Sequence, residues 1–87
     1  MEFDPNAYLV GKSSVLGYTN VMYQAKNRNG DSVIVDIKYY DEKCANATVI
    51  HESRDRVAVE AHMHYGKNVA EINSIIHDAL IGFHMSV

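Results

Sequence analysis

The chain has 87 residues, of which 47% are hydrophobic and 22% are charged, and its net charge is −3. This composition indicates one small folded domain, residues 1–87, that buries roughly 60–65% of the surface its unfolded chain exposes. The Lys and Arg residues are scattered and form no basic stripe that could follow phosphates, which disfavours nucleic-acid binding. A lone cysteine, Cys44, and no recognisable signal peptide or membrane segment favour a protein of the cytoplasm, that of the producing or the host cell.

The N-terminal residues 1–12 are compatible with a short helical turn that begins after an Asp4 cap, with Pro5 in its first position. Residues 16–26 alternate as a strand does. One row of this strand is Val21, Tyr23 and Ala25, and the other is Tyr18, Asn20, Met22 and Gln24.

Residues 27–31 contain Asn29-Gly30, a pair that tolerates positive φ and predicts a hairpin. Residues 32–40 follow as a second strand with two clear rows. We expect the row of Val33, Val35, Ile37 and Tyr39 to face the core, and the row of Ile34, Asp36, Lys38 and Tyr40 to face outward.

Residues 41–46 are polar and aperiodic, which predicts a loop, and residues 47–52 predict a short third strand. After a turn at residues 53–55, the fourth strand has the most regular alternation in the chain. Its apolar row, expected to face the core, is Val57, Val59, Ala61, Met63 and Tyr65, and its opposite row is Arg56, Ala58, Glu60, His62 and His64.

The C-terminal segment predicts one helix from a capping pair, Asn68 with Glu71, to about Gly82. Its apolar stripe has three-four spacing and consists of Val69, Ile72, Ile75, Ile76, Ala79, Leu80 and Phe83. The predicted fold is therefore α+β: a four-stranded antiparallel sheet, β-β-β-β-α, with the C-terminal helix packed on one face. Such a helix covers one face only, and the sequence leaves the strand order open.

A limited resemblance involves the last strand and the start of the helix. Val57, Val59, Tyr65, Gly66, Val69, Glu71 and Ile72 resemble the strand, Tyr-Gly turn and helix start of the alkaline-shock protein family. The resemblance spans about a quarter of the chain, and that family has a helix where this sequence has its Asn-Gly hairpin. We infer no function from it.

His62 and His64 are two residues apart on the fourth strand, so their imidazoles share a face with Glu60. These three residues are weak candidates for a metal site, to which strand pairing could add His51, Cys44 or Asp36. The simpler interpretation, which we favour, is a polar row on the uncovered side of the sheet, with no metal and no cofactor. On the helix, His77 and His84 with Asp78 suggest proton transfer only weakly.

Tyr18, Met22, Ile34 and Tyr40 lie on the outward rows, where the core does not need them. Tyrosine and methionine are enriched at protein interfaces, so we expect these four residues, with His62 and His64, to bind a partner. The alternative is that Tyr8, Leu9 and Val10 fold back over this face.

No catalytic signature is present, and we expect a protein that is not an enzyme. The leading hypothesis is a small acidic protein-binding module, an inhibitor or adaptor of the kind that phages and mobile elements encode, acting on an unidentified protein partner. The alternatives are a homo-oligomeric structural protein, in the simplest case a homodimer, and a metal- or small-ligand-binding domain that uses His62 and His64.

Overall fold

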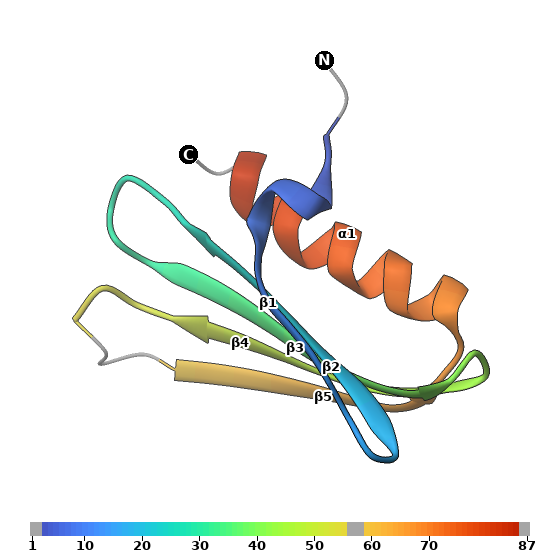
Figure 1. Cartoon of the computed structure of the whole chain (residues 1–87). Coiled ribbons are helices and arrows are strands. Elements are labelled where there is room, and N and C mark those ends of the chain that lie inside the picture. The colour runs from blue at the N-terminus through green and yellow to red at the C-terminus, as the bar shows by residue number, and fades with distance from the viewer. Residues whose placement is uncertain (1–2, 56–58, 86–87) are drawn as a thin grey trace.

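The computed structural model describes residues 3–55 and 59–85, in which five strands precede one long helix. The elements are a 3-10 turn (Pro5–Tyr8), β1 (Leu9–Val15), β2 (Tyr18–Lys26), β3 (Ser32–Asp41), β4 (Cys44–Glu52), β5 (Val59–Lys67) and α1 (Val69–Met85). The strands form one antiparallel sheet in the order β1-β2-β3-β4-β5, and α1 lies across one face of it (Figure 1). The α+β class and the C-terminal helix are confirmed, but the sheet has five strands rather than four.

The additional strand is β1, and its sequence gives little sign of it. All seven of its residues are exposed, so no buried row produces an alternation of apolar and polar residues. Gly17, with φ of 101°, lies in the turn that separates β1 from β2, whereas the sequence predicted a single strand from Leu16. Before β1, the predicted short helical turn is a 3-10 turn, in which the Asp4 carboxylate accepts a hydrogen bond from the Asn6 N–H at 3.0 Å.

The N-terminal segment lies on the same side of the sheet as α1 (Figure 1). Phe3 and Tyr8 pack against the core, and the Phe3 ring centroid is 5.4 Å from that of His77 on the helix. Leu9 and Val10 remain exposed. The alternative in which this segment covers the outward face of the sheet is therefore wrong.

The β2–β3 hairpin forms at the predicted Asn-Gly turn. Gly30 has a φ of 86°, and the Asn27 N–H donates to the Asp31 carbonyl at 3.0 Å. The Asn27 side chain accepts a hydrogen bond from the Asp31 N–H at 3.1 Å. This segment is thus a hairpin and not the helix that the alkaline-shock proteins would have here.

The core lies between α1 and the central strands β2, β3 and β4. Its predicted rows are confirmed, and Val33, Val35 and Ile37 of β3 are fully buried. Burying a side chain of this size stabilises a fold by roughly 1.5–3 kcal/mol. The helix contributes Ile72, Ile76 and Leu80, all from its predicted stripe.

Reciprocal hydrogen bonds fix the start of α1. The Glu71 N–H donates to the Asn68 side-chain oxygen at 2.8 Å, and the Asn68 N–H donates to the Glu71 carboxylate at 3.2 Å, so the predicted capping pair is confirmed. The Val69 N–H also donates to the Glu42 carbonyl at 3.3 Å, which joins the helix to the β3–β4 turn. The helix continues to Met85, one turn beyond the predicted end.

Strand β4 begins at Cys44, so the prediction of a loop over residues 41–46 is wrong. β3 extends to Asp41, whose carboxylate accepts the Lys43 N–H at 2.7 Å in a tight turn. Ala45 and Ala47 are buried under α1 although alanine carries little β-strand signal. Small side chains here let the helix approach the sheet closely.

The two faces of β5 are the reverse of the prediction. Val49 of β4, which points into the core, pairs with His62, and Thr48 pairs with Met63. His62, His64 and Glu60 therefore face the helix side, whereas Val59, Met63 and Tyr65 face away from it and are at least 60% exposed. Alternation shows which residues share a face but not which face is covered. Arg56, Val57 and Ala58 lie outside the described residues.

Within residues 3–55 and 59–85, no helix combines the length and the hydropathy that a membrane span requires.

Candidate functional site

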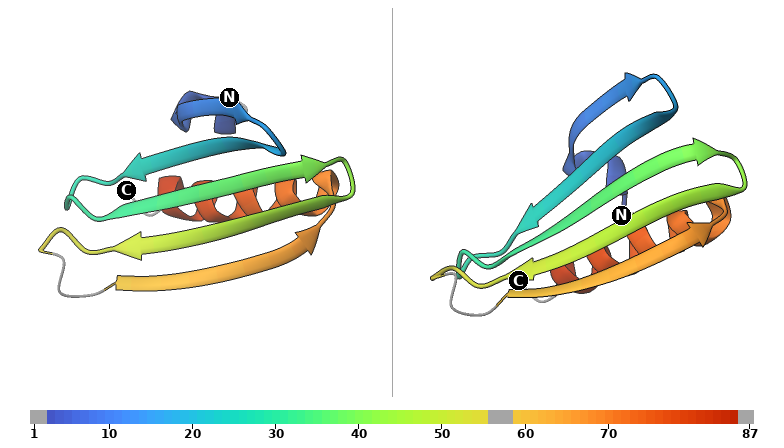
Figure 2. Two further views of the ribbon diagram at one scale, coloured as in Figure 1. Left: turned by 60° about the horizontal axis from the view of Figure 1, so that its bottom comes forward. Right: turned by 90° about the horizontal axis from the view of Figure 1, so that it is seen from below.

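The first candidate is the face of the sheet opposite α1, which we call the open face. The right-hand view of Figure 2 shows this face from below, with the helix behind the strands and none of the described segments in front. Four strands contribute large apolar side chains that include Tyr18 and Met22 of β2, Ile34 and Tyr40 of β3, Ile50 of β4, and Val59, Met63 and Tyr65 of β5.

Strand register arranges these side chains in transverse rows. Ile34 pairs with Ile50, which pairs with Ala61, and these residues form an apolar row. In the neighbouring row Met22 pairs with Asp36, and Thr48 pairs with Met63. The methionines lie at the ends of that row, with polar groups between them.

One end of the open face is aromatic. The ring centroids of Tyr18 and Tyr40 are 5.8 Å apart, and the Lys38 ammonium lies 5.5 Å from the Tyr18 ring centroid. The Tyr65 hydroxyl donates to the Met63 sulfur at 3.0 Å. A shallow depression of about 230 Å³ lies here, lined by Asp36, Lys38, Tyr40, Asn46, Thr48, Met63 and Tyr65.

Two polar side chains at the centre of the open face, those of Asn20 and Asp36, are hydrogen-bonded to each other. The Asn20 side-chain amide donates to the Asp36 carboxylate at 2.6 Å and to the Ile37 carbonyl at 2.8 Å. Covering Asn20 and Asp36 therefore leaves them partnered, which lowers the desolvation cost of burying the surface.

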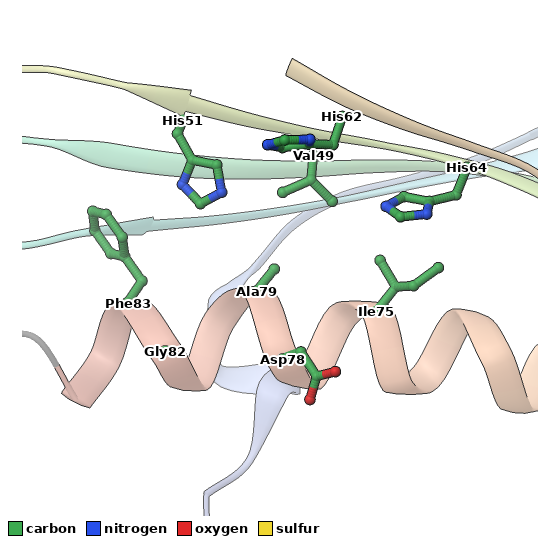
Figure 3. Close-up of a pocket in the computed structure, with 9 residues that line it drawn as sticks. All are labelled: Val49, His51, His62, His64, Ile75, Asp78, Ala79, Gly82 and Phe83. Carbon is green, nitrogen blue, oxygen red and sulfur yellow. The ribbon is translucent and has the colours of Figure 1, made fainter. Parts of the chain in front are cut away.

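The second candidate is a groove of about 460 Å³ on the helix side of the sheet, between β4, β5 and α1 (Figure 3). We call it the histidine groove. Its residues are Val49, His51, His62, His64, Ile75, Asp78, Ala79, Gly82 and Phe83.

The groove exists because the helix covers the sheet incompletely. α1 packs on β2, β3 and β4, and edge strand β5 extends past it. On the helix, Ala79 and Gly82 border this gap, and a Cβ atom placed on Gly82 would meet nothing within 4 Å. Small helix residues opposite an edge strand therefore leave space that larger side chains would fill.

The histidines of the groove come from adjacent strands. The ring centroids of His51 and His62 are 6.2 Å apart in an edge-to-face arrangement. His62 Nε2 is 2.9 Å from Glu60 Oε1, which fixes the orientation of that ring. In Figure 3 the imidazoles of His62 and His64 lie over the groove, whereas the Asp78 carboxylate points away from them.

The structure separates the predicted partner-binding residues into two groups. Tyr18, Met22, Ile34 and Tyr40 lie together on the open face, as expected, but His62 and His64 lie on the opposite side of the sheet.

Glu60 lies beside His62, and of the three residues that strand pairing could add to a metal site, His51, Cys44 and Asp36, the structure brings His51 to the histidine pair. Asp36 lies on the open face, and Cys44 lies at the β3–β4 turn. No group of three or more His, Cys, Asp or Glu side chains within the described residues is arranged to hold a metal ion. On the helix, His77 Nδ1 is 3.8 Å from the Asp78 carboxylate, and the side chain of His84 lies outside the described residues.

Sequence reasoning missed Ile50, Met63 and Tyr65 on the open face and Phe83 in the groove. The even spacing of Met63 and Tyr65 was visible, but assigning their face required the β4–β5 register. The groove depends on where α1 crosses the sheet, which no local pattern encodes.

Burial raises the pKa of the Tyr23 and Tyr39 hydroxyl groups on the covered side of the sheet, and for Tyr39 the neighbouring Tyr23 adds to the effect. These groups belong to the core boundary rather than to either candidate surface.

No protein family, curated protein or solved structure matches this chain. The two surfaces are therefore the basis for a functional proposal.

Proposed function

We propose that this protein is a protein-binding module, an inhibitor or adaptor that occupies the surface of a partner protein with its open face. The observation that carries the proposal is that an entire face of the sheet, with apolar and aromatic side chains from four strands, has none of the described segments over it. Antiparallel sheets that face water usually show a polar outer row, and this face departs from that rule along β5, at Tyr18 and Met22 of β2, and at Ile34 and Tyr40 of β3.

The size of the open face suits such a role. The molecule measures 37 × 33 × 19 Å, which is two layers thick. Standard strand spacings make the sheet about 24 Å wide and 30 Å long, or about 700 Å², close to the 800 Å² that each partner gives to a specific interface.

The side chains of the open face are also of the types that bind partner proteins. Met22 and Met63 adapt their shape to a partner, and the Tyr18–Tyr40 pair supplies large rings with polar hydroxyl ends. Asp36 and Lys38 carry opposite charges, so the centre of the face has no strong field that would repel either sign.

A charged substitution in this surface tests the proposal. Met22→Lys combined with Tyr40→Lys introduces two ammonium groups that binding would desolvate, and we expect it to reduce partner affinity at least 100-fold. Ser74→Lys, on the exposed outer side of α1, is the matched control and should bind as the natural protein does.

Native mass spectrometry of the untagged protein, alone and with lysate of the cells that produce it, measures the effect. The proposal requires one defined partner mass that the double variant loses and the control keeps. Retention of that mass by a folded double variant would contradict it, and a multiple of 9.8 kDa without lysate would favour the homo-oligomer instead.

A further inference from the structure

We propose that the histidine groove is a binding site for a small carboxylic acid with an aromatic body. The inference is independent of protein binding at the open face, because the groove lies on the other side of the sheet.

The groove has the size and lining of a small-molecule site. Its volume of about 460 Å³ lies within the roughly 300–1,000 Å³ typical of ligand pockets, which are mostly apolar with a few convergent polar groups. Val49 is its buried floor, and Ile75 and Ala79 line the helix wall with Phe83. A flat ring can pack against these side chains and bury apolar area.

The polar groups of the groove select the head group of the ligand. Three imidazoles, those of His51, His62 and His64, line the sheet side of this apolar space. An imidazolium offers two N–H donors, and hydrogen bonds from an ionised donor to a carboxylate are roughly twice as strong as neutral ones. The carboxylate of a ligand whose ring lies on Val49 and Ile75 would come within reach of these imidazoles.

Two carboxylates near the imidazoles make anion binding depend on whether the imidazoles are protonated. Glu60 on β5 accepts from His62, and Asp78 on α1 lies at the outer lip with its side chain 84% exposed. With neutral imidazoles these two carboxylates disfavour an anion, whereas protonation of His51, His62 and His64 reverses the local charge. Binding of an anion should therefore be stronger when these imidazoles are protonated than when they are neutral.

The test uses three probes that share one ring system. 2-Naphthoate carries the carboxylate, 2-naphthalenemethanol is neutral, and 2-naphthylmethylamine is a cation. Amide chemical shifts in NMR titrations at pH 5.5 and pH 8 measure both the affinity and the location of binding. We expect saturable binding of naphthoate at pH 5.5, at least tenfold weaker at pH 8, with shifts confined to residues of β4, β5 and α1 that border the groove.

Two variants test the location and the chemistry separately. Gly82→Trp fills the groove from a helix position with open space around it and should remove binding, whereas Ser74→Trp on the outer side of α1 should not. His64→Gln should weaken naphthoate at least fivefold and leave the neutral alcohol unchanged. His77→Gln, whose ring packs on Phe3 away from the groove, is its control.

Several results would overturn the proposal. Equal affinity for the acid, the alcohol and the amine would mean that the imidazoles select nothing, and a preference for the amine would mean that Glu60 and Asp78 dominate. Shifts outside the groove, or unchanged binding in both a folded Gly82→Trp protein and the His64→Gln protein, would remove the site itself.

Discussion

The central strand β3 and the edge strand β5 show two uses of the same kind of strand. β3 has ten residues and β5 has nine, and both alternate apolar and polar residues. In β3 the helix-facing row is fully buried at Val33, Val35 and Ile37, whereas β5 is exposed along most of its length on both faces. Because α1 covers β2, β3 and β4 and stops short of β5, the central strands have one buried face, whereas β5 is exposed on both faces.

Both candidate sites depend on this edge. Met63 and Tyr65 extend the open face, and His62 and His64, the residues between and beside them, line the histidine groove. One strand with little role in the core thus serves two surfaces of different chemistry. Substitutions in β5 should therefore change these surfaces with little effect on stability, whereas substitutions in the buried row of β3 should lower stability.

The largest difference in stability should appear between a truncation to alanine in β3 and one in β5. Ile37→Ala in β3 removes a fully buried side chain and should lower the free energy of unfolding by about 2–5 kcal/mol. Val59→Ala in β5, at a position 60% exposed, should change it by less than about 1 kcal/mol. Urea unfolding followed by circular dichroism measures both, and similar losses in the two variants would contradict the division between centre and edge.

A smaller loss of stability should follow from weakening the helix that covers β3. Asn68→Ala removes the side-chain oxygen that accepts the Glu71 N–H, and such a cap contributes about 1 kcal/mol. Thermal unfolding should show this loss, while Asn73→Ala on the exposed helix surface should not. Partner binding at the open face should be unchanged in the folded Asn68→Ala protein, and its loss would mean that the helix, rather than the sheet, forms the interface.

The smallest expected effect is the dependence of folding stability on pH above 10. The raised pKa values of Tyr23 and Tyr39 mean that the unfolded chain, in which the tyrosine pKa is near 10.0, loses these protons first as pH rises. Their contribution to stability is therefore complete below pH 10 and is lost as pH rises through the raised values of the folded state. The variant Tyr23→Phe with Tyr39→Phe should show a flatter decline of stability above pH 10 in urea titrations, and an unchanged slope would mean that other groups cause it.

The sequence predicted the centre of the molecule better than its edges, for physical reasons. Val35 and Ile37 lie in a strand with one face fully buried, so their alternation reports burial directly. The hairpin at Gly30 and the helix cap at Asn68 are local and carry their own signals. β1 has no buried face, so its sequence lacks the alternation of apolar and polar residues that would have predicted a strand.

The candidate sites were predicted only where they lie on central strands. Tyr18, Met22, Ile34 and Tyr40 were placed on one face correctly, because β2 and β3 each have a buried row that identifies the other row as outward. In β5 neither row is buried. The alternation therefore predicted correctly which residues share a row, but it did not indicate which row faces the helix.

Photocrosslinking from the open face tests the central claim most directly. A benzophenone amino acid in place of Met63, on the exposed edge of that face, is compared with the same group in place of Ser74 on the outer side of α1, in cells that produce the protein. Our account predicts one defined covalent product with another protein from position 63 and none from position 74. Crosslinking from position 74 alone, or the same products from both positions, would contradict the assignment of the open face as the binding surface.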